Sequence, residues 1–430
     1  MDLLAIRADV ERGERMPRSR FCLPVLVLLA AGCAAGTGGA GGPCKPTLTC
    51  ASQAYECGAF VDSCGATQQC GSCAAGTTCN RADGGPGFCA TSGPFPPAGN
   101  PDGACQQSLP AAALPEDTSS PTTVVGTGTA ASCTYAELVA AVAKGGIITF
   151  DCGADPVTIP VTATLQLRTD RHTVIDGGNR VTLDGGHAVR ILEWNSGNWQ
   201  VNTNVLTLQH LVLVNGRASG TELVPAGQEA ACSTGYADGQ GGALLLRDGV
   251  LHAVDVTFAS NQAALIGPDT GGGAVYLLGA RPATISRCSF LHNRASNAGA
   301  IGSLFATDFI YDSLFDGNDA TGTGANDVSA AQCPSTASHQ IGSGGNGGAI
   351  YSDGVAMDVT ICGTQVRNNH AGAFGAAVFF TSNDASRKGT LTIRDSLMFS
   401  NAAENPYWQW KPGISTNANT PEPVNSDIRP

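Results

Sequence analysis

The sequence predicts an all-β solenoid, a parallel β-helix, from a repeat, from its residue content and from its turn residues. Short β-branched and aromatic runs alternate with Gly, Asn and Asp, and the repeat has no helical spacing. Self-similarity at a period of roughly 25 residues indicates a solenoid in which each repeat is one coil of about three strands. The repeats start near a Gly/Ala pair and end on Asn-x-Ala, at 241–263, 272–295, 298–320, 347–371 and 375–403.

The asparagine near the end of each repeat is predicted to be structural. Parallel strands of successive coils lie about 4.8 Å apart, so equivalent asparagines form a column whose amides can hydrogen-bond to one another. Asn also tolerates the left-handed backbone of a tight bend. We therefore expect a ladder, rather than catalytic groups, at Asn261, Asn293, Asn318, Asn369 and Asn401.

The strand after each Gly/Ala pair is expected to have an inner and an outer face. Side chains alternate along a strand, and one column of positions is always aliphatic, which predicts that it faces inward: Leu244, Val275, Ile301, Ile350 and Val378. The neighbouring columns should form an exposed, shallow strip of small and aromatic residues. That strip holds Tyr276, Tyr351 and Phe379, with Arg247 and Asp353 in different coils.

Length, charge and cysteine content limit the classes of function. A chain of 430 residues is long enough for about three domains. Its formal charge of −12 argues against nucleic-acid binding and against simple adsorption to anionic lipid. Its 17 cysteines crowd towards the front of the chain, which indicates an oxidising compartment.

The N-terminal segment has the features of an export signal. Residues 1–15 are mixed in charge, so we expect Met16 to be the true start. From Met16 a basic stretch precedes FCLPVLVLLAA and then Gly-Cys, which predicts a signal peptide within residues 1–32. Leu29 to Cys33 resembles a bacterial lipobox, and the resemblance implies lipid attachment at Cys33. Cleavage as an ordinary signal peptide is the alternative, and no later run is long enough to span a bilayer.

Three short regions are expected before the solenoid. Residues 33–43 are Gly/Ala-rich and read as a tether. Residues 44–90 carry eight cysteines and few large apolar residues, so disulfides must replace a core, with pairings that spacing leaves open. The pattern CGAFVDSCGATQQCGSC resembles a small module of exported myxobacterial proteins. Residues 91–130 are rich in Pro, Ser, Thr and Ala and are predicted to be a linker.

The β-helix is predicted over residues 131–405, with a cap at each end. Thr134 and Glu137 form a capping box, and Gly145 lies where a helix should stop, so Tyr135 to Lys144 is expected to be a short helix. A helix there would cover the open edge of the first coil. Residues 406–430 are expected to be a C-terminal cap or tail.

The paired Gly-Gly-Ala-aliphatic and Phe-x-x-Asn elements carry a family resemblance over roughly residues 145–405. They resemble the repeats of chlamydial polymorphic outer-membrane proteins and the right-handed β-helices of the pectate-lyase-like superfamily. The resemblance implies a right-handed parallel β-helix. It implies little about activity, because this fold carries adhesins, lyases and hydrolases.

The outer strip is poor in the groups that catalysis requires. A polyuronate lyase needs a basic group and cations, and a glycosidase needs two nearby carboxyls. The four tryptophans form two pairs among amide side chains, Trp194 with Trp199 and Trp408 with Trp410, and such a setting suits stacking against sugar rings. The alternative for Trp408 and Trp410 is that they cover the C-terminal end of the solenoid. The histidines show no metal-ligand spacing, and we expect neither metal nor cofactor. The candidate ligand-binding residues are Trp194, Trp199, Tyr276, Tyr351, Phe379, Asp269, Arg387, Lys388, Trp408 and Trp410.

Cysteines after residue 130 predict two further bridges. Cys232 and Cys333 lie in the two longest insertions and are expected to join over the first-strand face. Cys133 and Cys152 are expected to tie the cap helix to the first coil. Cys288 and Cys362 lie in strand cores and should stay as buried thiols.

The sequence favours a lipid-anchored surface protein with a non-catalytic binding role, in adhesion or polysaccharide recognition. The expected partner is a polysaccharide or another cell-surface ligand, and not nucleic acid. The membrane would be contacted through the lipid anchor alone, at the bacterial outer membrane or cell surface. The alternative is a polysaccharide lyase or glycoside hydrolase whose charged groups come from inserted loops.

Overall fold

The structure is a computed structural model in which the chain forms two compact units, residues 1–92 and 93–430. The structure describes residues 50, 57–61, 64, 66–72, 77–80, 88–91, 95–221, 238–265, 267, 270–324, 344–355, 357–383 and 388–430. The predicted signal peptide, the tether and the lipid-attachment residue Cys33 lie outside these ranges.

The first unit contains two small hairpins and disulfide bonds. Strand β1 (Ala59–Val61) pairs antiparallel with β2 (Thr67–Gln69), and β3 (Thr77–Asn80) with β4 (Phe88–Thr91). Disulfides join Cys50 to Cys70 and Cys57 to Cys79. Cross-links of this kind stabilise segments too small to bury a core.

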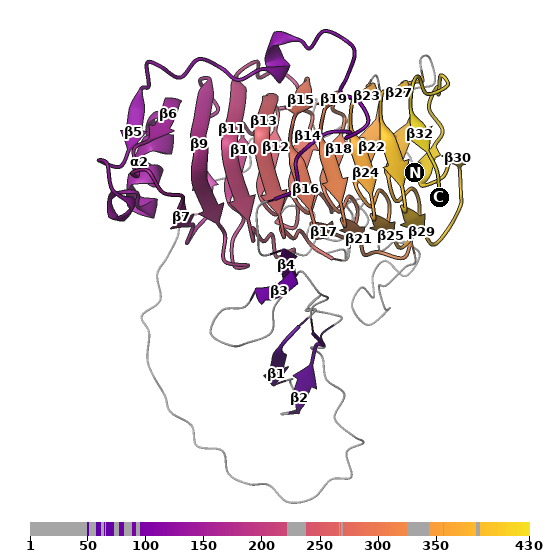
Figure 1. Ribbon diagram of the computed structural model, residues 1–430, viewed down its shortest axis with the longest axis horizontal. Helices are drawn as coiled ribbons and strands as arrows, with labels where there is room; N and C mark the ends of the chain where they lie inside the picture. Colours follow the sequence, from indigo (N-terminus) through magenta and orange to yellow (C-terminus); the bar gives the residue numbers. More distant parts are fainter. Residues whose placement is uncertain are drawn as a thin grey trace, which may run out of the picture. The chain divides into compact units, whose positions relative to one another are not determined.

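The second unit is solenoid-like and all-β, and its first sheet takes its strands in coil order. Figure 1 shows the strands side by side along the unit. Neighbours in this sheet are parallel except at its end, where β30 (Gln409–Lys411) runs antiparallel to β31 (Ile414–Thr416). The other strands are β8 (Leu165–Gln166), β10 (Leu192–Asn195), β12 (Leu244–Arg247), β14 (Val275–Leu278), β18 (Ile301–Leu304), β22 (Ile350–Gly354) and β26 (Val378–Ser382).

The second sheet has 15 strands and changes character along the unit. It begins with β5 (Thr123–Val125), β6 (Gly146–Phe150) and β7 (Val157–Pro160), and three long strands follow: β9 (Thr173–Asp184), β11 (Val205–Val214) and β13 (Val250–Ala259). In later coils two shorter strands replace each long one. They are β15 (Ala283–Ser286) and β16 (Ser289–Leu291), β19 (Asp308–Tyr311) and β20 (Leu314–Asp316), β23 (Val359–Cys362) and β24 (Gln365–Arg367), and β27 (Leu391–Arg394) and β28 (Leu397–Phe399), with β32 (Asp427–Ile428) last.

A third, four-stranded sheet completes each coil: β17 (Arg294–Ala295), β21 (Asp319–Ala320), β25 (His370–Ala371) and β29 (Ala402–Ala403). The asparagines lie directly before these strands. Each Asn amide nitrogen donates to the side-chain oxygen of the next Asn at 2.9–3.0 Å, from Asn261 through Asn401. The column is almost fully buried in its middle. It therefore satisfies its own polar atoms while holding successive coils in register.

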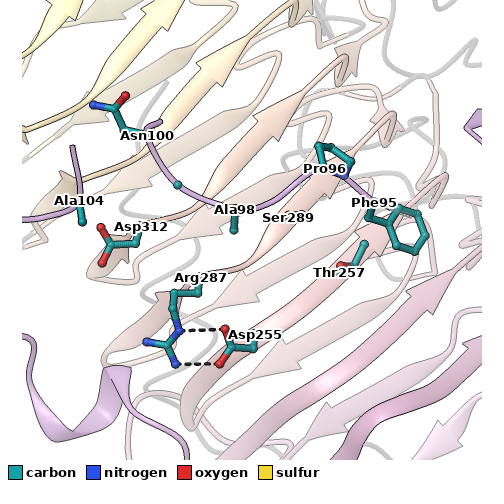
Figure 2. Close-up of a pocket in the computed structure, with 11 residues that line it drawn as sticks. Phe95, Pro96, Ala98, Asn100, Ala104, Asp255, Thr257, Arg287, Ser289 and Asp312 are labelled. Atoms are coloured by element: carbon teal, nitrogen blue, oxygen red, sulfur yellow. Dashed lines mark hydrogen bonds and ion pairs between the residues drawn. The ribbon is translucent and has the colours of Figure 1, made fainter. Parts of the chain in front are cut away.

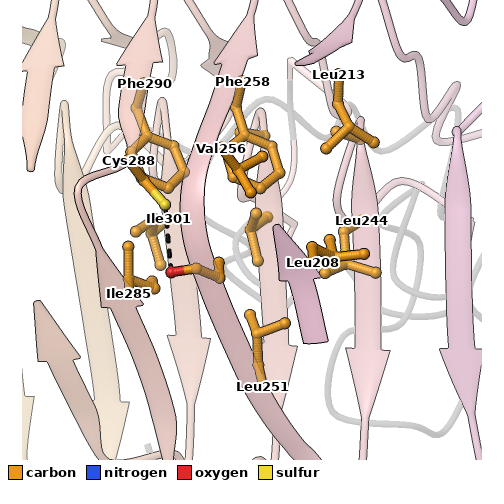
Figure 3. Packing of buried hydrophobic residues seen from close by; sticks show 14 of the residues in the cluster. Leu208, Leu213, Leu244, Leu251, Val256, Phe258, Ile285, Cys288, Phe290 and Ile301 are labelled. Carbon is orange, nitrogen blue, oxygen red and sulfur yellow. Dashed lines mark hydrogen bonds between the residues drawn. The ribbon is translucent and has the colours of Figure 1, made fainter. Parts of the chain in front are cut away.

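The predicted inward column of the first sheet is confirmed. Strand register places Leu244, Val275, Ile301, Ile350 and Val378 on top of one another, and all are buried. A second column inside the unit is aromatic. Phe258, Phe290 and Phe315 stack almost parallel, with ring centroids 4.8 and 4.7 Å apart; Figure 3 shows the first two in the core.

The predicted cap helix is present as α2 (Tyr135–Lys144). Thr134 Oγ accepts a hydrogen bond from the Glu137 N–H at 3.2 Å, as a capping residue should. The helix buries Leu138, Ala141 and Val142 against the first coils and ends at Gly145, whose φ is +68°. A disulfide between Cys133 and Cys152 fixes its approach to the solenoid.

The prediction of a linker over residues 91–130 is wrong for the residues that the structure describes. Residues 95–118, here called the strap, lie along the second sheet, and Figure 1 shows this purple segment crossing the strands. The Cys105 N–H donates to Asp312 Oδ1 at 2.7 Å, and the Gln106 N–H donates to Asp395 Oδ2 at 3.0 Å. Nearly every residue has a backbone N–H, so bonds of this kind cannot be recognised from amino-acid composition. The sequence of the strap therefore resembles that of a flexible linker.

The strap also changes the predicted cysteine assignment. Cys362 is not a thiol but forms a disulfide with Cys105, closing a sequence separation of 257 residues. Cys288 is a buried free thiol, as expected, and burial raises its pKa to about 12. Gly363 makes room for the strap, because a Cβ there would lie 2.3 Å from the Cys105 nitrogen. The expected bridge between Cys232 and Cys333 lies outside the described residues.

We expect Asn318→Ala to destabilise the fold. The substitution removes the amide between Asn293 and Asn369. The buried backbone N–H of Asn293 loses its acceptor, and the Asn293 and Asn369 side chains each lose one hydrogen bond. The free energy of unfolding should fall by roughly 2–4 kcal/mol, measured by denaturant titration. Asn198→Ala, at an exposed position, is the matched control. A loss no larger than that of the control would show that the ladder is not needed for stability.

A buried acid lies between apolar neighbours in an inner column of the second sheet. Asp308 lies in register between Ala283 and Val359, is fully buried, and has Ser352 Oγ 3.4 Å from its Oδ2. Burial raises the pKa of the Asp308 carboxyl to about 7 from an ordinary value of 3.8. Between these two pH values the unfolded chain loses this proton while the folded chain keeps it, so the contribution of Asp308 to stability falls as pH rises.

Asp308→Asn should therefore stabilise the protein at high pH. We expect little change in the free energy of unfolding at pH 4 and a gain of roughly 1–4 kcal/mol at pH 8, measured by thermal or denaturant unfolding. The exposed Asp155→Asn serves as control. An equal effect of Asp308→Asn at both pH values would contradict a raised pKa.

Candidate functional site

The strongest candidate site is a row of five aromatic rings at the end of the first sheet, here called the aromatic row. Its successive rings are Tyr351, Phe379, Phe374, Tyr407 and Trp408. Neighbouring ring centroids lie 5.4, 6.1, 5.3 and 4.7 Å apart. These separations are within the range of favourable aromatic contact, so the row is continuous.

Strand alternation and two turns build this row. Tyr351 and Phe379 are paired on β22 and β26 and point outward, because Ile350 and Val378 beside them point inward. Phe374 comes just before the turn at Gly375, whose φ is +63°. Tyr407 and Trp408 lie in the turn before β30 and are 50% and 41% exposed, so the row opens to solvent at this end.

The rest of the outer strip is not the exposed surface that the sequence predicts. Leu245 and Tyr276 are nearly buried. A Cβ at Gly302 would lie only 2.7 Å from Tyr276 Cδ2, so the tyrosine ring fills the space above this glycine. Tyr276 is thus a packing residue. Phe379 is also buried, at 7% exposure, so within the aromatic row Tyr407 and Trp408 are the exposed rings.

The four tryptophans have different positions. Trp194 is fully buried in the main core and donates from Nε1 to the Asp248 carbonyl at 3.3 Å, so it is not a surface binding residue. Its register with Leu246, on an inner column, explains this burial. Trp199 packs edge-on against Phe305, with centroids 5.4 Å apart. Trp410 packs against the core, and the Lys411 ammonium lies 5.4 Å from its ring centroid.

The charged residues of the outer strip do not converge. Asp353 accepts hydrogen bonds from the Tyr351 hydroxyl at 3.0 Å and from Asn383 Nδ2 at 2.7 Å, and burial raises the pKa of its carboxyl. Arg247 lies in the same column three strand spacings away, about 14 Å. Lys388 donates to the Asn417 carbonyl at 2.9 Å. Asp269 and Arg387 lie outside the described residues.

A second group of charges runs along the bends of the second sheet. His210 Nδ1 lies 3.0 Å from Asp176 Oδ1, and His210 Nε2 lies 3.8 Å from Asp255 Oδ2. Asp255 in turn accepts two hydrogen bonds of 2.8 Å from Arg287. Asp312 and Asp395 continue the column, and all of these except Asp176 have a positive φ.

This charged column is not among the features predicted from the sequence, although the sequence carries a signal for it. A polar residue or glycine separates the two strand runs of every repeat, as in AVDVTF, ISRCSF, IYDSLF, ICGTQV and IRDSLM. Such residues tolerate the left-handed bend. Aligning the repeats at this point would have revealed a charged column, and the structure shows that the strap binds to it.

A possible metal-ligand set does not fit a metal. Cys105, Cys362 and Asp395 have ligand atoms within 4.8 Å of one another, but the two cysteines are joined in a disulfide and offer no thiolate.

Among the described helices, none has the length and apolar character needed to cross a membrane. No protein-family model, curated protein or solved structure matches the chain. The case for function therefore rests on the residues themselves.

Proposed function

We propose that this protein is an exported, lipid-anchored surface protein that binds polysaccharide through the aromatic row, on a right-handed β-helix of the pectate-lyase-like type. The observation that carries the proposal is the row of five contacting rings that opens to solvent at Tyr407 and Trp408. A sugar ring presents apolar C–H faces that pack on aromatic rings, while its hydroxyls bond to nearby polar groups.

The surroundings of the exposed rings suit an uncharged chain of sugars. Asn405 and Gln409 flank Tyr407 and Trp408, and both are exposed. Their amides can donate to and accept from hydroxyls. The Tyr351 hydroxyl of the row bonds to the carboxyl of Asp353, which is half-buried and whose pKa is raised by burial. A row of rings with few charges supports extended recognition rather than bond cleavage.

Disulfides support the proposed location. Bridges at Cys50–Cys70, Cys57–Cys79, Cys105–Cys362 and Cys133–Cys152 form and persist in oxidising compartments. The signal within residues 1–32 and the lipobox at Cys33 then provide export and attachment to the bacterial outer membrane or cell surface. A lyase or hydrolase is the weaker alternative, because the described charges of the outer strip lie apart.

Trp408→Ala should weaken polysaccharide binding. Removing one stacking platform is expected to reduce affinity about tenfold, because one aromatic contact contributes on the order of 1 kcal/mol. The measurement is titration of neutral and acidic polysaccharides with the chain from residue 34, after a glycan-array screen. Val201→Ala, which alters an exposed aliphatic residue elsewhere, is the matched control.

Two outcomes of the same assay would reject the proposal. One is binding that Trp408→Ala and Tyr407→Ala both leave unchanged. The other is release of unsaturated or reducing sugars from any of the polysaccharides, which would identify the protein as an enzyme.

Replacing Cys33 should release the protein from the membrane. In cells that label lipoproteins with radioactive palmitate, we expect the wild-type chain to incorporate label and Cys33→Ala to lose it and become soluble. Cys22→Ala, which changes the other cysteine of the signal region, should retain the label. Retention of the label by Cys33→Ala would rule out the lipobox.

A further inference from the structure

The strap and the second sheet line a cavity of about 440 Å³ that is open to solvent and separate from the aromatic row. Its strap side includes Phe95, Pro96 and Asn100, and its sheet side includes Thr257, Ser289 and the bend residues Asp255, Arg287 and Asp312. Figure 2 shows Phe95 and Thr257 near one end of the cavity and Asp312 towards the other. Its volume is in the range of small-molecule sites.

The sheet side of the cavity includes two hydroxyls, those of the half-buried Thr257 and the nearly buried Ser289. Thr257 and Ser289 are paired on neighbouring strands and point outward, because Phe258 and Phe290 beside them point into the core. Within the described part of the chain, neither hydroxyl forms a hydrogen bond. Neighbouring parallel strands lie about 4.8 Å apart, so two different hydroxyls of one small ligand can bond to them.

The strap side supplies an apolar surface. Phe95 packs against Ala259, Leu291 and Leu314 and also lines the cavity, and Pro96 lies next to it. A ring held by its neighbours presents a fixed platform, at low entropic cost, to the apolar face of a ligand.

The charges around the cavity favour a ligand without negative charge. Both oxygens of Asp255 accept from Arg287 at 2.8 Å, so this guanidinium is already paired. Asp312 adds a second carboxylate, which accepts from the Cys105 N–H. Two carboxylates against one guanidinium leave the lining negative, and a uronate or a phosphate would be repelled.

Covalent and hydrogen bonds hold the cavity open in advance. The Cys105–Cys362 disulfide fixes the strap beside it. Asn100 donates from its backbone to the Gly363 carbonyl at 2.8 Å and from its side chain to the Asp395 carbonyl at 2.9 Å. Gly99 has a φ of +93° and runs close to Asp312. A preformed site avoids the entropy of ordering the strap when a ligand binds.

We propose that this cavity, the strap cavity, binds one neutral sugar ring. The ring stacks on Phe95 and hydrogen-bonds through its hydroxyls to Thr257, Ser289 and the outer lone pairs of Asp255. The site is independent of the aromatic row, since it lies on the other large sheet and shares no residue with it.

The test is calorimetric or NMR titration of the chain from residue 34 with glucose, galactose, N-acetylglucosamine and galacturonate. We expect at least one of the three neutral sugars to bind with a dissociation constant on the order of 1 mM, and galacturonate to bind at least about tenfold more weakly. Thr257→Val and Ser289→Ala, which remove only hydroxyls, should each weaken neutral-sugar binding about two- to tenfold. Val201→Ala, at an exposed residue outside both proposed sites, is the matched control and should leave it unchanged, and Trp408→Ala is measured beside it to detect monosaccharide binding at the aromatic row.

Unaltered circular dichroism and thermal unfolding verify that each variant is folded. The proposal is overturned by absence of binding for all three neutral sugars at about 50 mM. It is equally overturned by galacturonate binding as well as they do, or by binding that survives both hydroxyl deletions. Loss of monosaccharide binding in Trp408→Ala would assign it to the aromatic row and reject the strap cavity, whereas failure of polysaccharide binding alone would leave the cavity unaffected.

Discussion

The parallel register between successive coils is the constraint on which the rest of the structure depends. Backbone pairing aligns Leu244 with Val275 and then with Ile301, and every other position repeats in the same way. The side chains of a buried column therefore have one another as their main contacts, and they must pack or hydrogen-bond among themselves. Aliphatic columns do this by packing, Phe258 and Phe290 do it by stacking, and the asparagines do it by bonding amide to amide. Asp308 has no such match within its column, which is why its carboxyl resists ionisation.

The same register creates the surface to which the strap binds. Residues at the bends of the second sheet repeat from coil to coil, so Asp312 and Asp395 offer carboxylates facing an extended segment. The backbone N–H groups of Cys105 and Gln106 in the strap donate to these carboxylates. The disulfide between Cys105 and Cys362 attaches the strap covalently to the sheet. A segment without secondary structure of its own thus becomes part of the solenoid, and the strap cavity exists because the strap arches over the strands between its fixed points.

Features that repeat or are local could be predicted from the sequence, and features that join distant segments could not. The asparagine positions, the inner column and the helix Tyr135–Lys144 follow from periodicity and capping residues. The burial of Trp194 could have been predicted by extending the register one coil further, to its pairing with Leu246. Alternation from the inward Ile361 likewise places Cys362 on the outer face, where the strap covers it. Its partner Cys105 is 257 residues away, and nothing in the spacing of cysteines identifies that pair. The aromatic row was only partly foreseen, because Phe374 joins it through a turn rather than through a strand column.

Charge gives the two proposed sites a common preference. The formal charge of −12 works against anionic ligands over the whole chain, and it does so most strongly where carboxylates lie near the ligand. The strap cavity has two carboxylates and one paired guanidinium, while Tyr351 of the aromatic row bonds to the half-buried carboxyl of Asp353. Among the described lining residues of the strap cavity, the Arg287 guanidinium is already paired with Asp255, whereas recognising or cleaving a polyuronate requires an available cation. Stacking on Phe95 or Trp408 and hydrogen bonds from uncharged groups need no cation, so the ligand proposed for each of the two sites is a neutral sugar.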